Sequence, residues 1–305
     1  MFIKFIIFIL YGCQGTNAEQ GYIGGAICAE RAALVRLRLY SNPVILKVVI
    51  VTDSVNPVAP GVMCREFLLS HAHPDTEIVL GGCVGEVINV CKLGQLYPHP
   101  YVYRHQPRDR ILEYAKNYAS TVCIQGATRC DDEVQKLHKR ALAVIQYDDA
   151  TSLHPIQFAA GVLYQNGDIE VTWMLKALEY GNTLDPVSQL VVGMERRRVE
   201  CLSTAPRVEV ESTEGNGPIA ATSNSRLDYF TPKIILMTDQ FGVCHAPFAM
   251  ARSILSEHNY GAVSVVVGHM PDSGYEMCRA DALAPPSPSG DLPLTPEDFE
   301  HMCCL

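Results

Sequence analysis

The chain is short of basic residues relative to acidic ones. Its 305 residues include 24 lysines and arginines against 33 aspartates and glutamates, which gives a formal net charge of −9. Because nucleic-acid phosphates require Lys and Arg, such a chain is a poor candidate for binding a nucleic-acid backbone. The one basic cluster, Arg196–Arg198, is expected to be a solvated face beside a loop. This cluster is the one feature of the sequence that favours RNA as an alternative substrate.

Membrane-length apolar runs and a regular cysteine framework are also absent. No apolar stretch is long enough to span a bilayer, so no membrane partner is expected. The twelve cysteines follow no regular spacing, which favours a reducing compartment and a cytoplasmic location. Residues 1–10 are apolar apart from Lys4, so a short signal peptide is the alternative. The run is at the short end for a signal, which favours a buried strand.

The chain repeats itself, and its length suggests about two domains. Residues 46–53 (LKVVIVTD) read like residues 232–239 (PKIILMTD), and both runs are typical of strands buried on two faces. Residues 59–68 (APGVMCREFL) then read like residues 246–255 (APFAMARSIL), at an offset of 187 (246 minus 59). Upstream, Cys28 faces Asp185 at an offset of 157 (185 minus 28).

The repeat predicts an α/β protein of two tandem units, each a mixed sheet flanked by helices in three layers. We place the first unit at 1–105, shortened at its start, without the helix and the first strand that open the second unit. A linker and helix are expected at 106–130, and the second unit at 131–275. The composition of residues 196–231 predicts a loop insertion, and that of residues 276–305 a disordered tail.

Two cysteines of the first unit are expected at helix starts. Cys28 follows a glycine pair, and Cys64 follows Pro60. A helix N-terminus stabilises a thiolate, and two such termini aimed at one point would hold one cation, for which Zn²⁺ is the natural choice. On spacing alone, two buried and unliganded thiols remain the favoured alternative.

The neighbouring residues resemble a known family. Ile27–Leu34 (ICAERAAL) is very similar to the zinc-ligand motif of the cytidine deaminases. Asn17 and Glu19 resemble the Asn-x-Glu that binds the nucleoside sugar in that family, at the same distance before the cysteine. Residues 59–68 resemble its Ser-Pro-Cys-Gly-x-Cys-Arg-Gln stretch, and residues 93–101 resemble its Leu-Leu-Pro-x-Pro-Phe segment. The resemblance covers about residues 12–101, and about 131–270 weakly through the repeat.

This resemblance implies a zinc-dependent hydrolase that deaminates cytidine or deoxycytidine in the first unit. Zinc would be held by Cys28 and Cys64, and Glu30 would carry the proton from the attacking water to the ring and then to the leaving ammonia. Asn17 and Glu19 would hold the ribose hydroxyls, whereas a loop-capping role is the alternative for that pair. The family also implies a homo-oligomer, here a dimer of two-unit chains.

The sequence departs from the family pattern at one ligand position. Gly61 stands where the family has its first cysteine of Pro-Cys-x-x-Cys, so tetrahedral zinc would be one protein ligand short. Cys13 or Cys83 could substitute if the loops allow. The alternative function is therefore a catalytically impaired, deaminase-like protein that binds a nucleoside or a partner.

The second unit has lost the chemical groups altogether. By the repeat, the residues that face Cys28, Glu30, Gly61 and Cys64 are Asp185, Val187, Phe248 and Ala251. Valine cannot move protons, and no thiolate remains at these positions. We expect a scaffold, in which nearby His154 and His245 are hydrogen-bonded structural residues.

Overall fold

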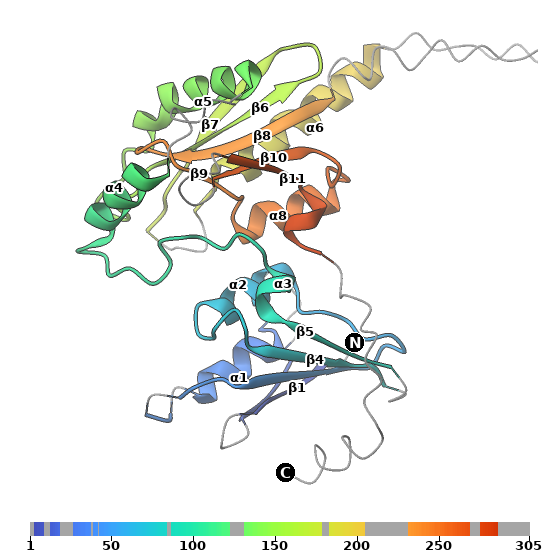
Figure 1. Cartoon of the computed structure of the whole chain (residues 1–305). Helices are drawn as coiled ribbons and strands as arrows, with labels where there is room; N and C mark the ends of the chain where they lie inside the picture. Colours follow the sequence, from blue (N-terminus) through green and yellow to red (C-terminus); the bar gives the residue numbers. More distant parts are fainter. Residues whose placement is uncertain are drawn as a thin grey trace, which may run out of the picture. The chain divides into compact units, whose positions relative to one another are not determined.

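A computed structural model of the chain falls into two compact units. It describes residues 3–8, 13–18, 27–37, 39–41, 43–83, 87–122, 131–178, 183–204, 231–268 and 275–285. Unit 1 comprises Met1–His105 with Asp281–Leu305, and unit 2 comprises Gln106–Ala280 (Figure 1). Within the described residues, no helix is both long and apolar enough to cross a membrane.

Unit 1 is built on a five-stranded mixed sheet. Its elements are β1 (Ile3–Phe8), β2 (Cys13–Thr16), α1 (Ala29–Leu37), β3 (Lys47–Thr52), α2 (Val62–Leu69), β4 (Glu77–Gly81), β5 (Ile88–Lys92) and α3 (Leu93–Leu96). The strand order is β2-β1-β3-β4-β5. Strands β3 and β4 are parallel, and the other neighbouring pairs are antiparallel. Helix α1 packs on β1, β2 and α2.

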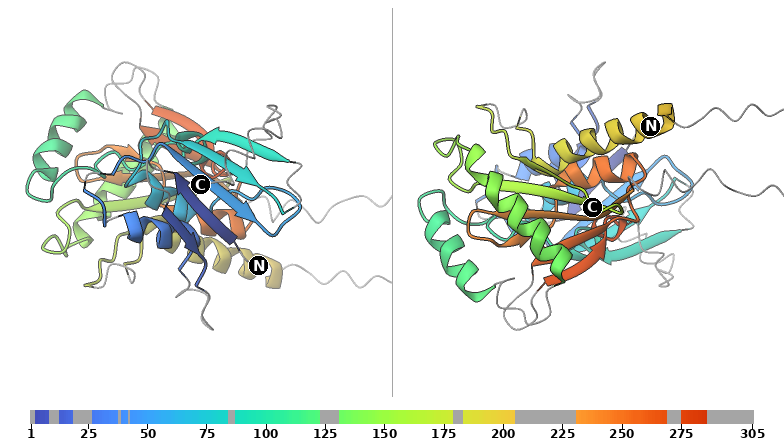
Figure 2. Two further views of the ribbon diagram at one scale, coloured as in Figure 1. Left: turned by 90° about the horizontal axis from the view of Figure 1, so that it is seen from below. Right: turned by 90° about the horizontal axis from the view of Figure 1, so that it is seen from above.

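Unit 2 carries a six-stranded sheet with helices on both faces. Its elements are α4 (Ile111–Thr121), α5 (Asp132–Val144), β6 (Phe158–Tyr164), β7 (Ile169–Trp173), α6 (Pro186–Thr204), β8 (Pro232–Asp239), β9 (Cys244–His245), α8 (Ala249–Glu257), β10 (Ser264–Gly268) and β11 (Tyr275–Arg279). The main order is β11-β10-β8-β6-β7, and β9 pairs with β8. Helix α5 covers one face and α8 the other (Figure 1). The view from above shows α5 across β6 and β8 (Figure 2).

The two sheets have the same topology. Strand β3 of unit 1 corresponds to β8, and the parallel pair β3–β4 corresponds to the parallel pair β8–β10. Among the described residues, each unit also has one isolated antiparallel bridge before the helix that follows its first two strands, Ala18–Ile27 before α1 and Leu175–Leu184 before α6. The bridges reproduce the offset of 157 (175 minus 18, and 184 minus 27). The α/β class, with mixed sheets flanked by helices, is confirmed.

Strand β6 shows why the apolar runs become central strands. All seven of its residues are buried, because helices cover both faces of the sheet. On one face, a core cluster joins Val134 and Leu137 of α5 to Leu236 of β8 and Val266 of β10. The central strands of unit 2 are therefore buried between two helical layers.

Several expectations about the segments need correction or stay untested. A strand within residues 1–10 is confirmed as β1, and it lies between β2 and β3, so the expected lack of a first strand is wrong. Helix α6 continues to Thr204, so the segment expected to be a loop insertion starts as helix. Strand β11 occupies part of the expected tail. Residues 205–230 and 286–305 lie outside the described residues.

Candidate functional site

Three side chains predicted to do chemistry meet at the starts of α1 and α2. One ligand atom each from Cys28, Glu30 and Cys64 lies within 4.8 Å of the other two. Glu30 and Cys64 are buried, and Cys28 is partly exposed. Among the described residues this is the one group of His, Cys, Asp and Glu side chains placed to hold a metal ion. Two thiolates and a carboxylate oxygen are ligands that suit Zn²⁺.

The helix starts explain this convergence. Cys28 directly precedes α1, and its carbonyl accepts the first helical hydrogen bond from the Ala32 N–H at 3.0 Å. Cys64 lies in the first turn of α2, where its N–H donates to the Gly61 carbonyl at 2.9 Å. Both thiols therefore lie near the positive end of a helix dipole, which favours the thiolate and hence metal binding.

Burial and mutual proximity set the protonation of the cluster. Burial raises the pKa of Glu30 to about 7, and the charge of Cys28 adds to the effect. A carboxyl group that titrates near neutrality is suited to accept and return a proton. A hydrogen bond with Cys28, together with burial, raises the pKa of the Cys64 thiol. Without a cation the Cys64 thiol therefore keeps its proton, and metal binding would release it.

The position of the missing ligand is sterically open. A Cβ atom placed on Gly61 would meet no heavy atom within 4 Å. The backbone there has φ −58° and ψ 153°, a conformation that any residue can adopt. Neither Cys13 nor Cys83 joins the cluster among the described residues, so the substitution considered for them does not occur. The site therefore fits a metal ion with two thiolate ligands and room for a third.

The residues expected to bind the sugar are only partly described. Asn17 lies beside the cluster, and its Oδ1 accepts a hydrogen bond from the Ala29 N–H at 2.9 Å. This is the capping contact that was the alternative for Asn17. Glu19 lies outside the described residues.

Unit 2 uses the equivalent positions for structure. Asp185 Oδ1 accepts hydrogen bonds from the backbone N–H groups of Val187 and Ser188 at 3.1 and 3.0 Å, so it caps α6. Val187 and Ala251 are completely buried. Phe248 packs edge-on against Phe158, with ring centroids 5.2 Å apart. A helix cap and core side chains therefore stand where unit 1 has two thiols and a carboxyl group.

Both units keep the same arginine contact. Arg65 Nε donates to the Pro60 carbonyl at 2.7 Å, and Arg252 Nε donates to the Pro247 carbonyl at 2.7 Å. Both arginines are buried, at 6% and 2% exposure. Since buried carbonyls must be hydrogen-bonded, these contacts hold each proline loop against the helix that follows it. The frame around the site is thus common to both units.

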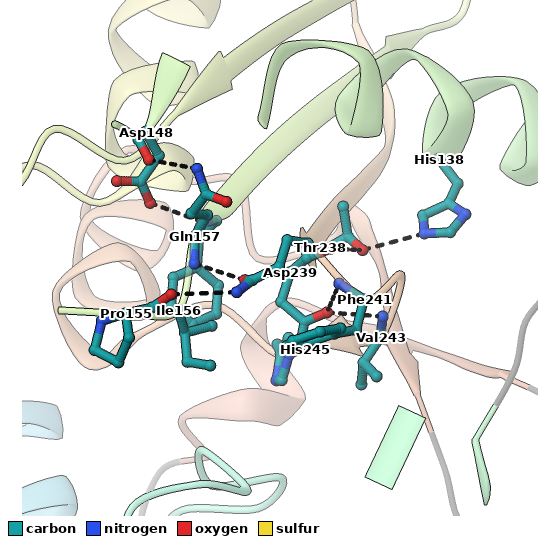
Figure 3. Close-up of polar contacts among 12 residues, drawn as sticks. His138, Asp148, Pro155, Ile156, Gln157, Thr238, Asp239, Phe241, Val243 and His245 are labelled. Carbon is teal, nitrogen blue, oxygen red and sulfur yellow. Dashed lines mark hydrogen bonds and ion pairs between the residues drawn. The ribbon is translucent and has the colours of Figure 1, made fainter. Parts of the chain in front are cut away.

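The buried histidine of unit 2 belongs to a structural network. His245 Nε2 lies 3.0 Å from Asp239 Oδ2, and Asp239 Oδ1 accepts from the backbone N–H groups of Phe241 and Val243 (Figure 3). These contacts connect both sides of the turn between β8 and β9. His245 is therefore hydrogen-bonded in the core, as expected.

The basic cluster on α6 is paired with acidic side chains. Arg197 lies 3.2 Å from both Asp168 and Glu170, and Arg198 lies 2.5 Å from Glu195. Since these charges are matched within unit 2, the cluster gives little support to an RNA substrate.

One buried ion pair was not anticipated from the sequence. Lys176 Nζ lies 2.7 Å from Asp148 Oδ1, with side chains 3% and 0% exposed. Asp148 Oδ2 also accepts the Phe158 N–H at 2.8 Å. No sequence signal points to this pair, because the two residues are 28 positions apart (176 minus 148) and the repeat aligns Lys176 with Glu19.

Comparison with known proteins identifies cytidine deaminases as relatives. No model of a known protein family matches the chain. A curated cytidine deaminase from Halalkalibacterium halodurans is 30% identical over 74 residues, which cover 24% of this chain and 56% of that protein. The chain thus matches little more than half the length of this relative. The match supports a relationship to the cytidine deaminase family over part of the chain.

The solved structures that are similar to parts of this chain are also described as cytidine deaminases. A cytidine deaminase from Burkholderia pseudomallei is 26% identical and has a TM-score of 0.31, over 33% of this chain and 81% of that one. Cytidine deaminases from Mycobacterium leprae and Mycobacterium tuberculosis are each 15% identical, with TM-scores of 0.34 over 51% of this chain. They are covered over 99% and 96% of their own lengths.

Proposed function

We propose, from the premise that part of this chain is related to the cytidine deaminases, that unit 1 hydrolytically deaminates cytidine or deoxycytidine with a Zn²⁺ cofactor. The observation that carries the proposal is the convergence of Cys28, Glu30 and Cys64 within 4.8 Å. Metal ligands and a buried proton carrier are the two groups this chemistry requires.

The chain's own groups have distinct parts in this reaction. Cys28 and Cys64 would hold the zinc ion, which when bound supplies the Lewis acidity that makes water a nucleophile at neutral pH. Glu30 would accept one proton from the attacking water and donate it to N3 of the cytosine ring. It would then take the second proton from the hydroxyl group now on C4 and donate it to the departing ammonia. Its burial against the two thiols keeps bulk water from exchanging that proton.

The nucleoside and the assembly follow from the same proposal. Glu19 and the amide nitrogen of Asn17 would bind the ribose hydroxyls, which selects a nucleoside over a free base. Unit 2 would act as a scaffold derived from a copy of unit 1, a view supported by the matching sheet topology. We further propose that the protein is cytoplasmic, as its irregularly spaced cysteines favour, and that it forms dimers of two-unit chains, as the family resemblance implies.

The decisive experiment follows cytidine absorbance with the purified full-length chain and added zinc. Glu30→Gln should lower kcat by about 10²- to 10⁴-fold, because general acid–base catalysis contributes that much. Glu113→Gln, an exposed glutamate on α4, is the matched control and should retain full activity. Absence of turnover with zinc supplied, or turnover that survives Glu30→Gln, refutes the proposal.

Gly61 favours a second candidate function. With two thiolate ligands the affinity for zinc should be weaker than with three, and a deaminase-like protein that binds a nucleoside or a partner without turnover would result. Metal analysis of the purified chain separates the two. A zinc content near one per chain supports the enzyme, and a small fraction with measurable nucleoside binding by calorimetry supports the binding protein.

A further inference from the structure

We propose that Asn17 is a positioning residue that caps α1 so that the side chain of Cys28 can serve as a metal ligand. The inference rests on the proposed metal site at Cys28 and adds to it. The family resemblance gives Asn17 a role at the sugar through its amide nitrogen. The contact in the structure uses the other atom, Oδ1, and points to the helix.

The start of α1 needs a cap from elsewhere. The residue at the N-cap position normally supplies a side-chain oxygen, from Ser, Thr, Asp or Asn, to an N–H of the first turn. Cys28 occupies that position, and a thiol is a weak acceptor. Its sulfur already lies close to Cys64, and it accepts a hydrogen bond from Arg31 Nη2 at 3.7 Å. The Ala29 N–H instead donates to Asn17 at 2.9 Å.

The backbone fixes Asn17 at that helix start. Ala18 and Ile27 exchange two hydrogen bonds, at 2.9 and 3.0 Å, so the residues on either side of this bridge are held face to face. Asn17 directly precedes Ala18, and Cys28 directly follows Ile27. The antiparallel pairing therefore places the asparagine opposite the cysteine.

Unit 2 has the same bridge, but its capping side chain follows the bridge, whereas that of unit 1 precedes it. Leu175 and Leu184 exchange hydrogen bonds at 3.0 and 2.9 Å. Asp185, which follows the bridge, caps α6 with its own carboxylate. Trp173 and Met174 precede the bridge, and they offer an N–H donor and a weakly accepting thioether, not a strong acceptor. In unit 2, which lacks the cysteine, the helix is capped by the residue directly before it, Asp185. In unit 1, which has Cys28 at that position, the cap comes from Asn17 across the bridge.

This arrangement separates two tasks that one side chain cannot perform together. A carboxylate at position 28 would cap the helix but would remove the thiolate. Because Asn17 provides the cap, Cys28 Sγ is kept for the metal ion, and the first turn that carries Glu30 is held in place. Partners that orient metal ligands in this way typically change metal affinity by about 10- to 100-fold when they are removed.

The test compares Asn17→Ala and Asn17→Asp in the full-length chain, with Thr16→Val, an exposed neighbour on β2, as control. Asn17→Ala should lower Co²⁺ affinity, read from the thiolate-to-cobalt absorption band, by about 10- to 100-fold. It should also lower amide hydrogen-exchange protection in the first turn of α1 by about five-fold, the usual effect of losing a cap. Asn17→Asp keeps the oxygen acceptor and should retain both, although KM for nucleoside should rise if the amide nitrogen binds the sugar.

A swap of the unit 2 residues into unit 1 gives a second test that needs no activity. Asn17→Met should lower first-turn protection in the metal-free chain, and Asn17→Met with Cys28→Asp should restore it while abolishing Co²⁺ binding. Unchanged first-turn protection and metal affinity in Asn17→Ala, or no recovery in the double variant, overturns the inference. A wild-type chain without turnover would sink the proposed function, and the hydrogen-exchange comparison would still decide the role of Asn17.

Discussion

Unit 1 and unit 2 place different side chains on the same pair of helix starts. In unit 1, the positions around α1 and α2 hold two thiols and a buried carboxyl group within 4.8 Å. In unit 2, Asp185 caps α6, and Val187 and Ala251 are in the core. The backbone at the start of the second helix is nearly unchanged, with φ −58° and ψ 153° at Gly61 and φ −64° and ψ 164° at Phe248.

The difference shows which contacts belong to the frame and which belong to the chemistry. The arginine-to-proline carbonyl contact and the isolated bridge occur in both units. The groups that differ are those that would touch a metal ion or a proton. The two units therefore share a fold that does not depend on the groups that differ, because the loops are held by main-chain bridges and by arginine contacts to main-chain carbonyls.

The largest expected effect concerns the buried ion pair that unit 2 has and the described part of unit 1 lacks. Lys176→Met would leave the Asp148 carboxylate buried without its cation, so the free energy of unfolding of unit 2 should fall by about 3–5 kcal/mol. Trp173, the single tryptophan of the chain, lies on β7 and reports the unfolding of this unit by fluorescence in urea.

Adding Asp148→Asn to Lys176→Met should recover part of that loss. Asparagine has no charge to bury and still accepts the Phe158 N–H. A loss below about 1 kcal/mol in the single variant, the value typical of exposed pairs, would contradict a structural role for the pair. Metal affinity in unit 1 should not change.

The next effect tests the open position in unit 1. Gly61→Cys should tighten zinc binding by about 100- to 1,000-fold, because one ligand in four contributes roughly a quarter of the about 10–16 kcal/mol typical of structural zinc sites. Competition with a chromophoric chelator measures the change. Gly61→Ala is the control without a ligand atom, and equal affinities for the two variants would show that position 61 does not face the metal.

The smallest effect concerns the packing of α1 on β2. A Cβ atom on Gly15 would lie 2.3 Å from the Ala29 carbonyl oxygen and 2.5 Å from the Ala33 nitrogen. Gly15→Ala should therefore force α1 away from the sheet and destabilise unit 1 by about 1–3 kcal/mol. Gly61→Ala, where the added Cβ meets nothing, should stay within about 0.5 kcal/mol. Circular dichroism in urea compares the two, and similar stabilities would show that the approach of α1 to β2 is not tight.

The sequence predicted the parts of the fold that local patterns encode. The two runs at residues 46–53 and 232–239 contain β3 and β8 in equivalent places, because unbroken β-branched runs suit strands covered on both faces. The motif around Cys28 and the helix start before Cys64 led to the cluster that the structure contains. The offset of 157 is reproduced by the backbone bridges.

The features that sequence could not predict depend on contacts between distant residues. Strand β1 was expected, but its place between β2 and β3 depends on pairing with residues 39 (47 minus 8) to 49 (52 minus 3) positions later. The end of α6 is supported by ion pairs such as Arg198–Glu195, which leave no apolar periodicity to read. The capping role of Asn17 was one of two alternatives, and only the hydrogen bond to Ala29 distinguishes them.

The last described residues, which follow unit 2 in the chain, return to unit 1. Arg65 Nη1 donates to the Pro285 carbonyl at 2.7 Å, across 220 residues, and Asp281–Pro285 are grouped with unit 1. Unit 2 is thus an insertion in the chain of unit 1, and a ribosome must finish the inserted unit before the first one can complete its contacts. Deletions near residue 280 should consequently damage the half of the protein that was synthesised first.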